Sequence, residues 1–163
     1  MIPNVQTAAP PFPDAAAMAW AARRGVPPQW RGFLAALLDT LDGGLEPKAR
    51  DKLLQAVGAR LAESTPLPAC ATLAELEARA NEALATMDWG YVAYFLDAGA
   101  RTLTVRHAAM PLVTTRRDVQ GQWIVPVLEG LHASWLAAQA EPGVRPRLWC
   151  SAVEPGSITL QSH

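Results

Sequence analysis

The sequence has little net charge and very few lysines. Its 163 residues include 14 basic and 15 acidic side chains, which leave a formal net charge of −1. A nearly neutral chain produces no long-range field that would attract a polyanion. Because the basic residues are also scattered along the sequence, we expect no nucleic-acid partner.

Cysteine is almost absent. Cys70 and Cys150 are the only two, and no CxxC or Cys/His spacing typical of a metal site occurs. Two distant cysteines do not form the framework of a disulfide-rich secreted domain. We therefore expect two reduced, packed thiols, no metal and no other cofactor.

A signal peptide and a membrane span are also missing from the sequence. The segment Met1 to Gln6 has neither a basic region nor an apolar core of a signal peptide, and no run approaches the ~20 apolar residues of a span. The prediction is a cytoplasmic protein without direct membrane insertion.

Prolines and apolar spacing define the organisation of the chain. Residues 1–13 are rich in proline and small residues and predict a flexible tail, followed by a single domain over 14–163. Apolar residues at helical spacing predict helices from Asp14 to Gly25, over 28–41 and over 47–64. Thr72 and Glu75 predict a capping box for a fourth helix that reaches Met87.

In the second half of the sequence, the spacing of the apolar residues changes from a helical to a strand-like pattern. Residues 91–96 and 102–106 flank a turn and predict a β-hairpin, and residues 147–153 and 157–161 predict a second one. Between them, Gly121 is expected to open a long apolar helix in which residues 123, 127, 131 and 135 recur every fourth position. The predicted class is α+β, with N-terminal helices and two hairpins that form an antiparallel sheet around this helix.

No arrangement typical of catalysis is present. The sequence lacks GxSxG and any glycine-rich phosphate loop. His107, His132 and His163 are isolated in sequence, and we expect structural or surface roles for them. Asp88 and Glu129 are the carboxylates best placed beside aromatic residues, but an ion-pair or capping role is favoured for Glu129. We expect no catalytic residues.

Tryptophan is the unusual residue, with six copies. Trp123 and Trp135 share one helical stripe, which favours the core or a subunit interface. Trp20 and Trp30 flank proline-interrupted segments and are candidates for contact with a ligand or a partner chain. An apolar helix without an active site is typical of an obligate oligomer.

Several stretches together resemble a known family. Residues 84–92 (LATMDWGYV) and 123–131 (WIVPVLEGL) are similar to the signature segments of the D subunit of bacterial cellulose synthase. Residues 103–107 (LTVRH), 51–58 (DKLLQAVG) and 68–70 (PAC) fit the same pattern. The resemblance covers roughly Pro28 to Trp135.

The resemblance implies a non-catalytic accessory subunit of cellulose biosynthesis. It implies a homo-octamer, built as a tetramer of dimers, whose passages guide β-1,4-glucan chains into crystalline cellulose beside the cellulose synthase catalytic complex and other accessory proteins. It places Gln29, Trp30 and Arg31 at the glucan. The residues expected at the oligomer interface or in the core are Trp89, Tyr91, Trp123, Leu131 and Trp135. The expected location is the cytoplasmic side of the inner membrane, with the periplasm as the alternative.

Two other functions remain open at this point. A small-ligand sensor would enclose an apolar pocket beneath Trp123 and Trp135. An enzyme acting on cellulose or its precursors would use Asp88 and Glu129.

Overall fold

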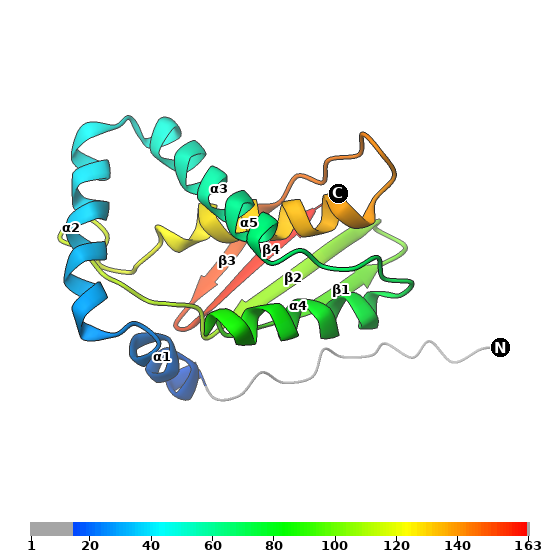
Figure 1. Cartoon of the computed structure of the whole chain (residues 1–163), viewed down its shortest axis with the longest axis horizontal. Helices are drawn as coiled ribbons and strands as arrows, with labels where there is room; N and C mark the ends of the chain where they lie inside the picture. Colours follow the sequence, from blue (N-terminus) through cyan, green and yellow to red (C-terminus); the bar gives the residue numbers. More distant parts are fainter. Residues whose placement is uncertain (1–14, 163) are drawn as a thin grey trace.

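The computed structural model describes residues 15–162 (Figure 1). The predicted tail over 1–13, the predicted cap Asp14 and His163 lie outside these residues. The helices are α1 (Ala15–Arg24), α2 (Pro28–Gly44), α3 (Pro47–Ser64), α4 (Leu73–Met87) and α5 (Ile124–Gln139), and the strands are β1 (Tyr91–Asp97), β2 (Thr102–Ala108), β3 (Trp149–Glu154) and β4 (Ser157–Ser162).

The strands form one antiparallel sheet in the order β1-β2-β4-β3. Each predicted hairpin is present, and the two hairpins join through β2 and β4 at the centre of the sheet. Helix α5 covers one face, where its buried residues meet those of β2 and β4 in a common core. The α+β prediction is therefore confirmed.

Two predicted helix boundaries need correction. Helix α5 begins at Ile124 rather than Gly121, because the Asp118 carboxylate accepts the Trp123 N–H at 2.8 Å and Gly121 adopts a φ of +70°. Pro126 then falls in the first turn, where its missing N–H has no helical partner to lose. Helix α2 runs to Gly44 rather than ending at 41, and its α-helical hydrogen bonding continues to the N–H of residue 45.

Helices α3 and α5 approach each other through two glycines. A Cβ at Gly58 would lie 1.9 Å from the carbonyl oxygen of Val127, and a Cβ at Gly130 would lie 2.0 Å from the carbonyl oxygen of Gln55. These distances are far below van der Waals contact, so neither position accepts a side chain. The glycines let the two backbones touch and fix the crossing point of the helices.

Helix α4 begins at the predicted cap and runs along the open edge of β1. The Glu75 N–H donates to the Thr72 hydroxyl at 3.1 Å, as the capping box requires. Asn81 binds both the N–H and the carbonyl of Val92, and Glu77 accepts the Tyr94 N–H at 2.8 Å. These bonds occupy the edge of β1, which protects it from pairing with another strand.

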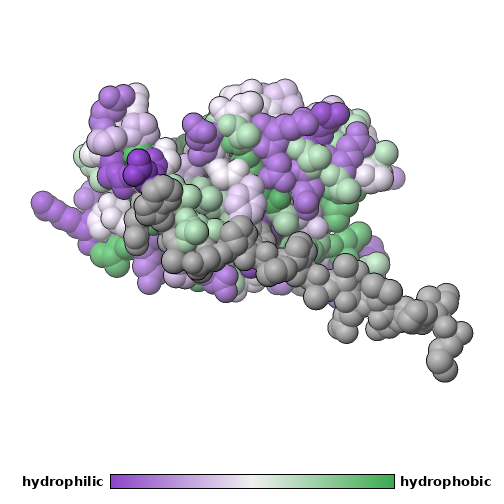
Figure 2. Space-filling model, turned by 90° about the horizontal axis from the view of Figure 1, so that it is seen from below, coloured by the Kyte–Doolittle hydropathy of each residue, from purple (hydrophilic) through white to green (hydrophobic). Residues whose placement is uncertain are grey.

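The surface over α4 is of mixed character. Seen from below, hydrophilic and hydrophobic residues are interspersed there (Figure 2). Arg79 and Glu82 form an exposed ion pair at 2.9 Å on this helix. One face of α4 is therefore solvated while the other packs on the core through Leu76, Ala80 and Leu84.

Candidate functional site

An apolar groove of about 490 Å³ lies between α2 and α3. Trp123 and Val127 of α5 and the turn from Met87 to Trp89 also line it. The lining from α2 and α3 is almost entirely leucine and valine, at positions 34, 37, 38, 41, 53, 54, 57 and 61. An open apolar surface of this kind is typical of a binding or assembly site.

Helix α2 buries very little of its own apolar surface. Of its 17 residues, all of which the structure describes, Leu38 alone is buried. In Figure 1 the helix stands at one end of the molecule, away from the sheet. The large exposed hydrophobic residues that it shares with α3 are Trp30, Phe33, Leu37, Leu53 and Val57. We call these five residues the α2–α3 apolar surface.

The three residues expected at the glucan lie in the first turn of α2. Trp30 is 53% exposed, lines the groove and meets the ring of Phe33 edge-on at 5.9 Å. Arg31 is half-buried and donates to the Val26 carbonyl at 3.1 Å, and Gln29 is exposed. Neither Gln29 nor Arg31 lines the groove. Consecutive helical residues point about 100° apart, so the three do not share one face.

The residues expected at an interface or in the core divide into two groups. Trp123, Leu131 and Trp135 are buried within one chain, and both indole N–H groups donate to backbone carbonyls at 2.9 Å. Trp89 and Tyr91 are half-buried, and Trp89 lines the groove. The side chain of Trp20 lies outside the described part of the chain.

A buried chain of hydrogen bonds joins the sheet, α5 and the groove. The Tyr94 hydroxyl lies 3.1 Å from His132 Nδ1, His132 Nε2 lies 2.9 Å from His107 Nδ1, and His107 Nε2 lies 2.7 Å from the Trp89 carbonyl. Because a carbonyl only accepts, His107 Nε2 must donate. If both rings are neutral, His107 Nδ1 must then accept the N–H of His132 Nε2. His132 Nδ1 in turn accepts a hydrogen bond from the Tyr94 hydroxyl.

Burial keeps these groups uncharged. It lowers the pKa of His107 to about 4, despite the opposing hydrogen bond to Trp89. Burial and the neighbouring His107 lower the pKa of His132 well below its ordinary value. Burial also raises the pKa of Tyr94. The network is therefore a fixed structural element at neutral pH.

This network holds the turn that forms one wall of the groove. Asp88 and Gly90, on either side of Trp89, have φ values of +54° and +79°. A side chain at Gly90 would lie 2.0 Å from the Ala108 carbonyl oxygen, so the turn packs directly on β2. The three histidines were expected to have structural or surface roles, and their sequence positions did not predict that His107 and His132 meet. Two features of the sequence indicate that both histidines face the core. His107 alternates with Val105 along a strand, and His132 follows a core leucine by four residues.

The two candidate carboxylates do not share a site. Glu129 accepts one hydrogen bond from Gln55 Nε2 at 2.9 Å and one from the Cys150 N–H at 3.1 Å. Asp88 ends α4 in the left-handed conformation and lines the groove, whereas Glu129 does not. The geometry thus assigns Glu129 to the junction of α3, α5 and β3.

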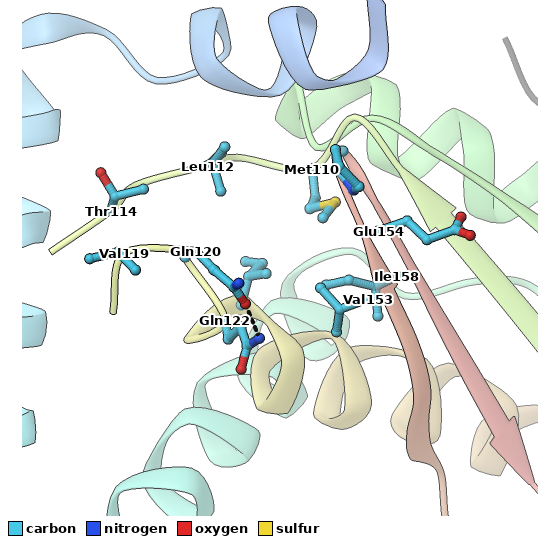
Figure 3. A pocket seen from close by; sticks show the side chains of 13 residues that line it. Met110, Leu112, Thr114, Val119, Gln120, Gln122, Val153, Glu154 and Ile158 are labelled. Carbon is cyan, nitrogen blue, oxygen red and sulfur yellow. Dashed lines mark hydrogen bonds between the residues drawn. The ribbon is translucent and has the colours of Figure 1, made fainter. Parts of the chain in front are cut away.

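A smaller cavity of about 290 Å³ lies between the loop before α5 and the β3–β4 turn (Figure 3). Met110, Val153 and Ile158 give it an apolar wall. Gln120 and Gln122 lie on its other side and share a hydrogen bond of 2.6 Å. Trp123 lines the α2–α3 groove, whereas Trp135 lines neither the groove nor this cavity. Neither space is therefore the pocket beneath both tryptophan rings that the sensor hypothesis requires.

Within residues 15–162, none of the helices combines the length and the apolar composition needed to span a bilayer.

Comparison with known proteins agrees with the motifs. The family of the cellulose synthase D subunit matches residues 16–162. Cellulose synthase operon protein D of Komagataeibacter xylinus is 34% identical over 112 residues, which cover 69% of this chain and 72% of the relative. The protein of the same name from Komagataeibacter sucrofermentans matches to the same extent. The family match spans nearly the whole described structure and confirms the resemblance seen in residues 84–92 and 123–131, so this chain belongs to the family of the cellulose synthase D subunit.

Proposed function

We propose that this protein is a non-catalytic accessory subunit of bacterial cellulose synthesis. It forms a homo-octamer, a tetramer of dimers, whose passages guide nascent β-1,4-glucan chains and promote ordered, crystalline cellulose. It works on the cytoplasmic side of the inner membrane, beside the cellulose synthase catalytic complex and other accessory proteins. The relatives carry the name of the cellulose synthase operon, which supports the pathway.

The observation that carries the assembly is the α2–α3 apolar surface. Trp30 and Phe33 are more than half exposed, and the groove beside them is lined by aliphatic side chains. Exposing apolar surface to water costs about 25 cal/mol per Å². A second protomer that covers this surface would remove that cost. We therefore place a protomer contact on Leu37, Leu53 and Val57 of this surface, and we assign the Trp30 ring, in the first turn of α2, to the glucan.

The first turn of α2 supplies groups suited to a neutral sugar polymer. The indole of Trp30 can stack on the C–H face of a glucose ring, while the Gln29 amide offers hydrogen bonds at the exposed surface. Arg31 is anchored on the Val26 carbonyl and presents a planar guanidinium group, which suits hydrogen bonds to polar ligands. A moving chain needs several weak contacts rather than one deep pocket, because tight binding would stall it.

The experiment that tests assembly is the mass of the purified protein by light scattering coupled to size exclusion. The measured mass of the wild type should be near eight times 17.5 kDa. Leu37→Glu places a charge on the α2–α3 apolar surface and should shift the mass to smaller species. Val119→Glu is the matched control, because Val119 is 74% exposed and lies outside this surface.

The control variant should keep the wild-type mass. A wild-type protein that elutes as a monomer contradicts the octamer. An octamer that survives Leu37→Glu moves the contact to another surface.

A further inference from the structure

Helix α4 ends on an unusual residue. Asp88 adopts the left-handed conformation, with a φ of +54° and a ψ of +38°, and the Trp89 N–H after it donates to the Leu84 carbonyl at 3.0 Å. Glycine is the usual residue at this position of a helix end. A carboxylate there also lies at the negative end of the helix dipole, which is unfavourable. Asp88 therefore contradicts two local preferences at once.

The Asp88 carboxylate has no partner in the fold that would offset this cost. Among residues 15–162 its side chain takes part in no hydrogen bond and in no ion pair. Asp88 is also exposed, so it stabilises no core contact. A residue that breaks local rules without a structural gain is expected at a functional site.

Asp88 lies beside the start of α2, at the α2–α3 groove. A Cβ on Gly25 would lie 3.8 Å from the Asp88 carbonyl oxygen. Gly25 belongs to the junction of α1 and α2, which lines the groove together with Trp30. Trp89, next to Asp88 in the turn, lines it as well. Of the described residues that line the groove, Asp88 is the only ionisable one, and none is basic.

An ionised carboxylate near indole rings is suited to a sugar. An indole offers a flat face to the C–H groups of a glucose ring, and the two carboxylate oxygens can accept hydrogen bonds from neighbouring hydroxyls of one ring. Hydrogen bonds to an ionised acceptor are roughly twice as strong as those between neutral groups.

The linkage of a glucan decides whether such neighbouring hydroxyls exist. Every ring of a β-1,4-glucan carries free hydroxyls on the adjacent carbons 2 and 3. In a β-1,3-glucan the linkage uses the oxygen on carbon 3 of all rings except the terminal one. A carboxylate that accepts from both hydroxyls therefore favours the β-1,4 linkage.

We propose that Asp88 is a glucan-binding residue that forms one carbohydrate subsite with Trp30 and selects β-1,4-linked chains. The Trp30 ring stacks on the glucan, and the Asp88 carboxylate accepts hydrogen bonds from the hydroxyls on carbons 2 and 3. That the ligand is a glucan rests on the proposed function, whereas the role of Asp88 rests on the groove and on the conformation of the turn. Leu37, Leu53 and Val57 remain available for the protomer contact.

The test is calorimetric titration of the full chain with cellohexaose and with laminarihexaose, its β-1,3-linked counterpart. Asp88→Gly removes the carboxylate and suits the left-handed conformation, so this variant should melt at or above the temperature of the wild type. Its affinity for cellohexaose should be about tenfold lower, because two hydrogen bonds to an ionised acceptor are lost. The wild type should prefer cellohexaose, and Asp88→Gly should lose most of this preference.

Two further variants separate the loss of charge from the loss of the side chain. Asp88→Asn keeps the size of the side chain without its charge, and its affinity should fall between those of the wild type and Asp88→Gly. Glu141→Gln is the control, because Glu141 is exposed and does not line the groove. It should bind both sugars as the wild type does.

The outcomes distinguish this inference from the proposed function. If Asp88→Gly keeps the wild-type affinity for cellohexaose while Trp30→Ala loses it, Asp88 does not bind glucan and the proposed function stands. Equal affinity of the wild type for the two sugars overturns the selection of the linkage. A wild type that binds no cellohexaose contradicts the glucan contact of the proposed function itself.

Discussion

His107 Nδ1 and His132 Nε2 lie 2.9 Å apart in the core, with no carboxylate among their hydrogen-bond partners. Both rings are fully buried. The Trp89 carbonyl at one end and the Tyr94 hydroxyl at the other fix the proton positions. The pair therefore works as a neutral connector between α5, β2 and the turn beside the groove.

This arrangement predicts a loss of stability in mild acid. The pKa of His107 in the folded protein is about 4, below the ordinary value of 6.5. Between these values the unfolded chain binds a proton that the folded chain does not, so the free energy of unfolding decreases as pH falls from about 6.5 to 4. At pH 5 the expected loss from this one histidine is about 2 kcal/mol relative to pH 7.

Chemical denaturation at pH 7, 6 and 5 measures this loss. His107→Gln keeps an N–H donor for the Trp89 carbonyl but cannot titrate, so its stability should depend less on pH than that of the wild type. Equal stability of the wild type at pH 7 and pH 5 would contradict the neutral pair.

The Tyr94 hydroxyl should contribute measurably to stability. Tyr94→Phe leaves His132 Nδ1 buried without its donor, and the expected cost is about 2 kcal/mol in the free energy of unfolding. Tyr91→Phe is the control, because Tyr91 is half-buried and donates to the weak acceptor Met18 Sδ at 3.3 Å. A loss as large in Tyr91→Phe as in Tyr94→Phe would show that the buried chain has no special role.

The contact of α3 with α5 predicts that Gly58→Ala is strongly destabilising. The new Cβ would meet the Val127 carbonyl at 1.9 Å, and the helices must separate to admit it, at a cost of about 3 kcal/mol or more. Gly32→Ala in α2 meets nothing within 4 Å and should stabilise the protein by about 0.5–1 kcal/mol. Thermal unfolding compares the two variants, and a similar melting temperature for both would contradict the close contact.

The sequence predicted the elements well because their signals are local. The Thr72 capping box, the periodicity of α3 and the two hairpins all appear where the pattern placed them. The start of α5 was wrong because Gly121 belongs to a turn held by Asp118, a contact that no periodicity contains.

The site was less predictable, because it depends on contacts between distant segments. His107 and His132 are 25 residues apart and meet only after β2 and α5 pack together. Gln29, Trp30 and Arg31 are adjacent in sequence, yet only Trp30 reaches the groove, because a helix turns its neighbours away. Spacing alone cannot show which surface of α2 remains uncovered.

Trp30 should matter for glucan binding more than for folding. Its ring is 53% exposed, so Trp30→Ala removes a stacking surface while the core stays intact, and we expect about tenfold weaker binding of cellohexaose with an unchanged melting temperature. Trp30→Phe keeps an aromatic ring and should recover part of the affinity. Calorimetric titration of the three proteins measures the series. If Trp30→Ala and the wild type bind equally well, the first turn of α2 does not contact glucan, and binding must then come from another surface.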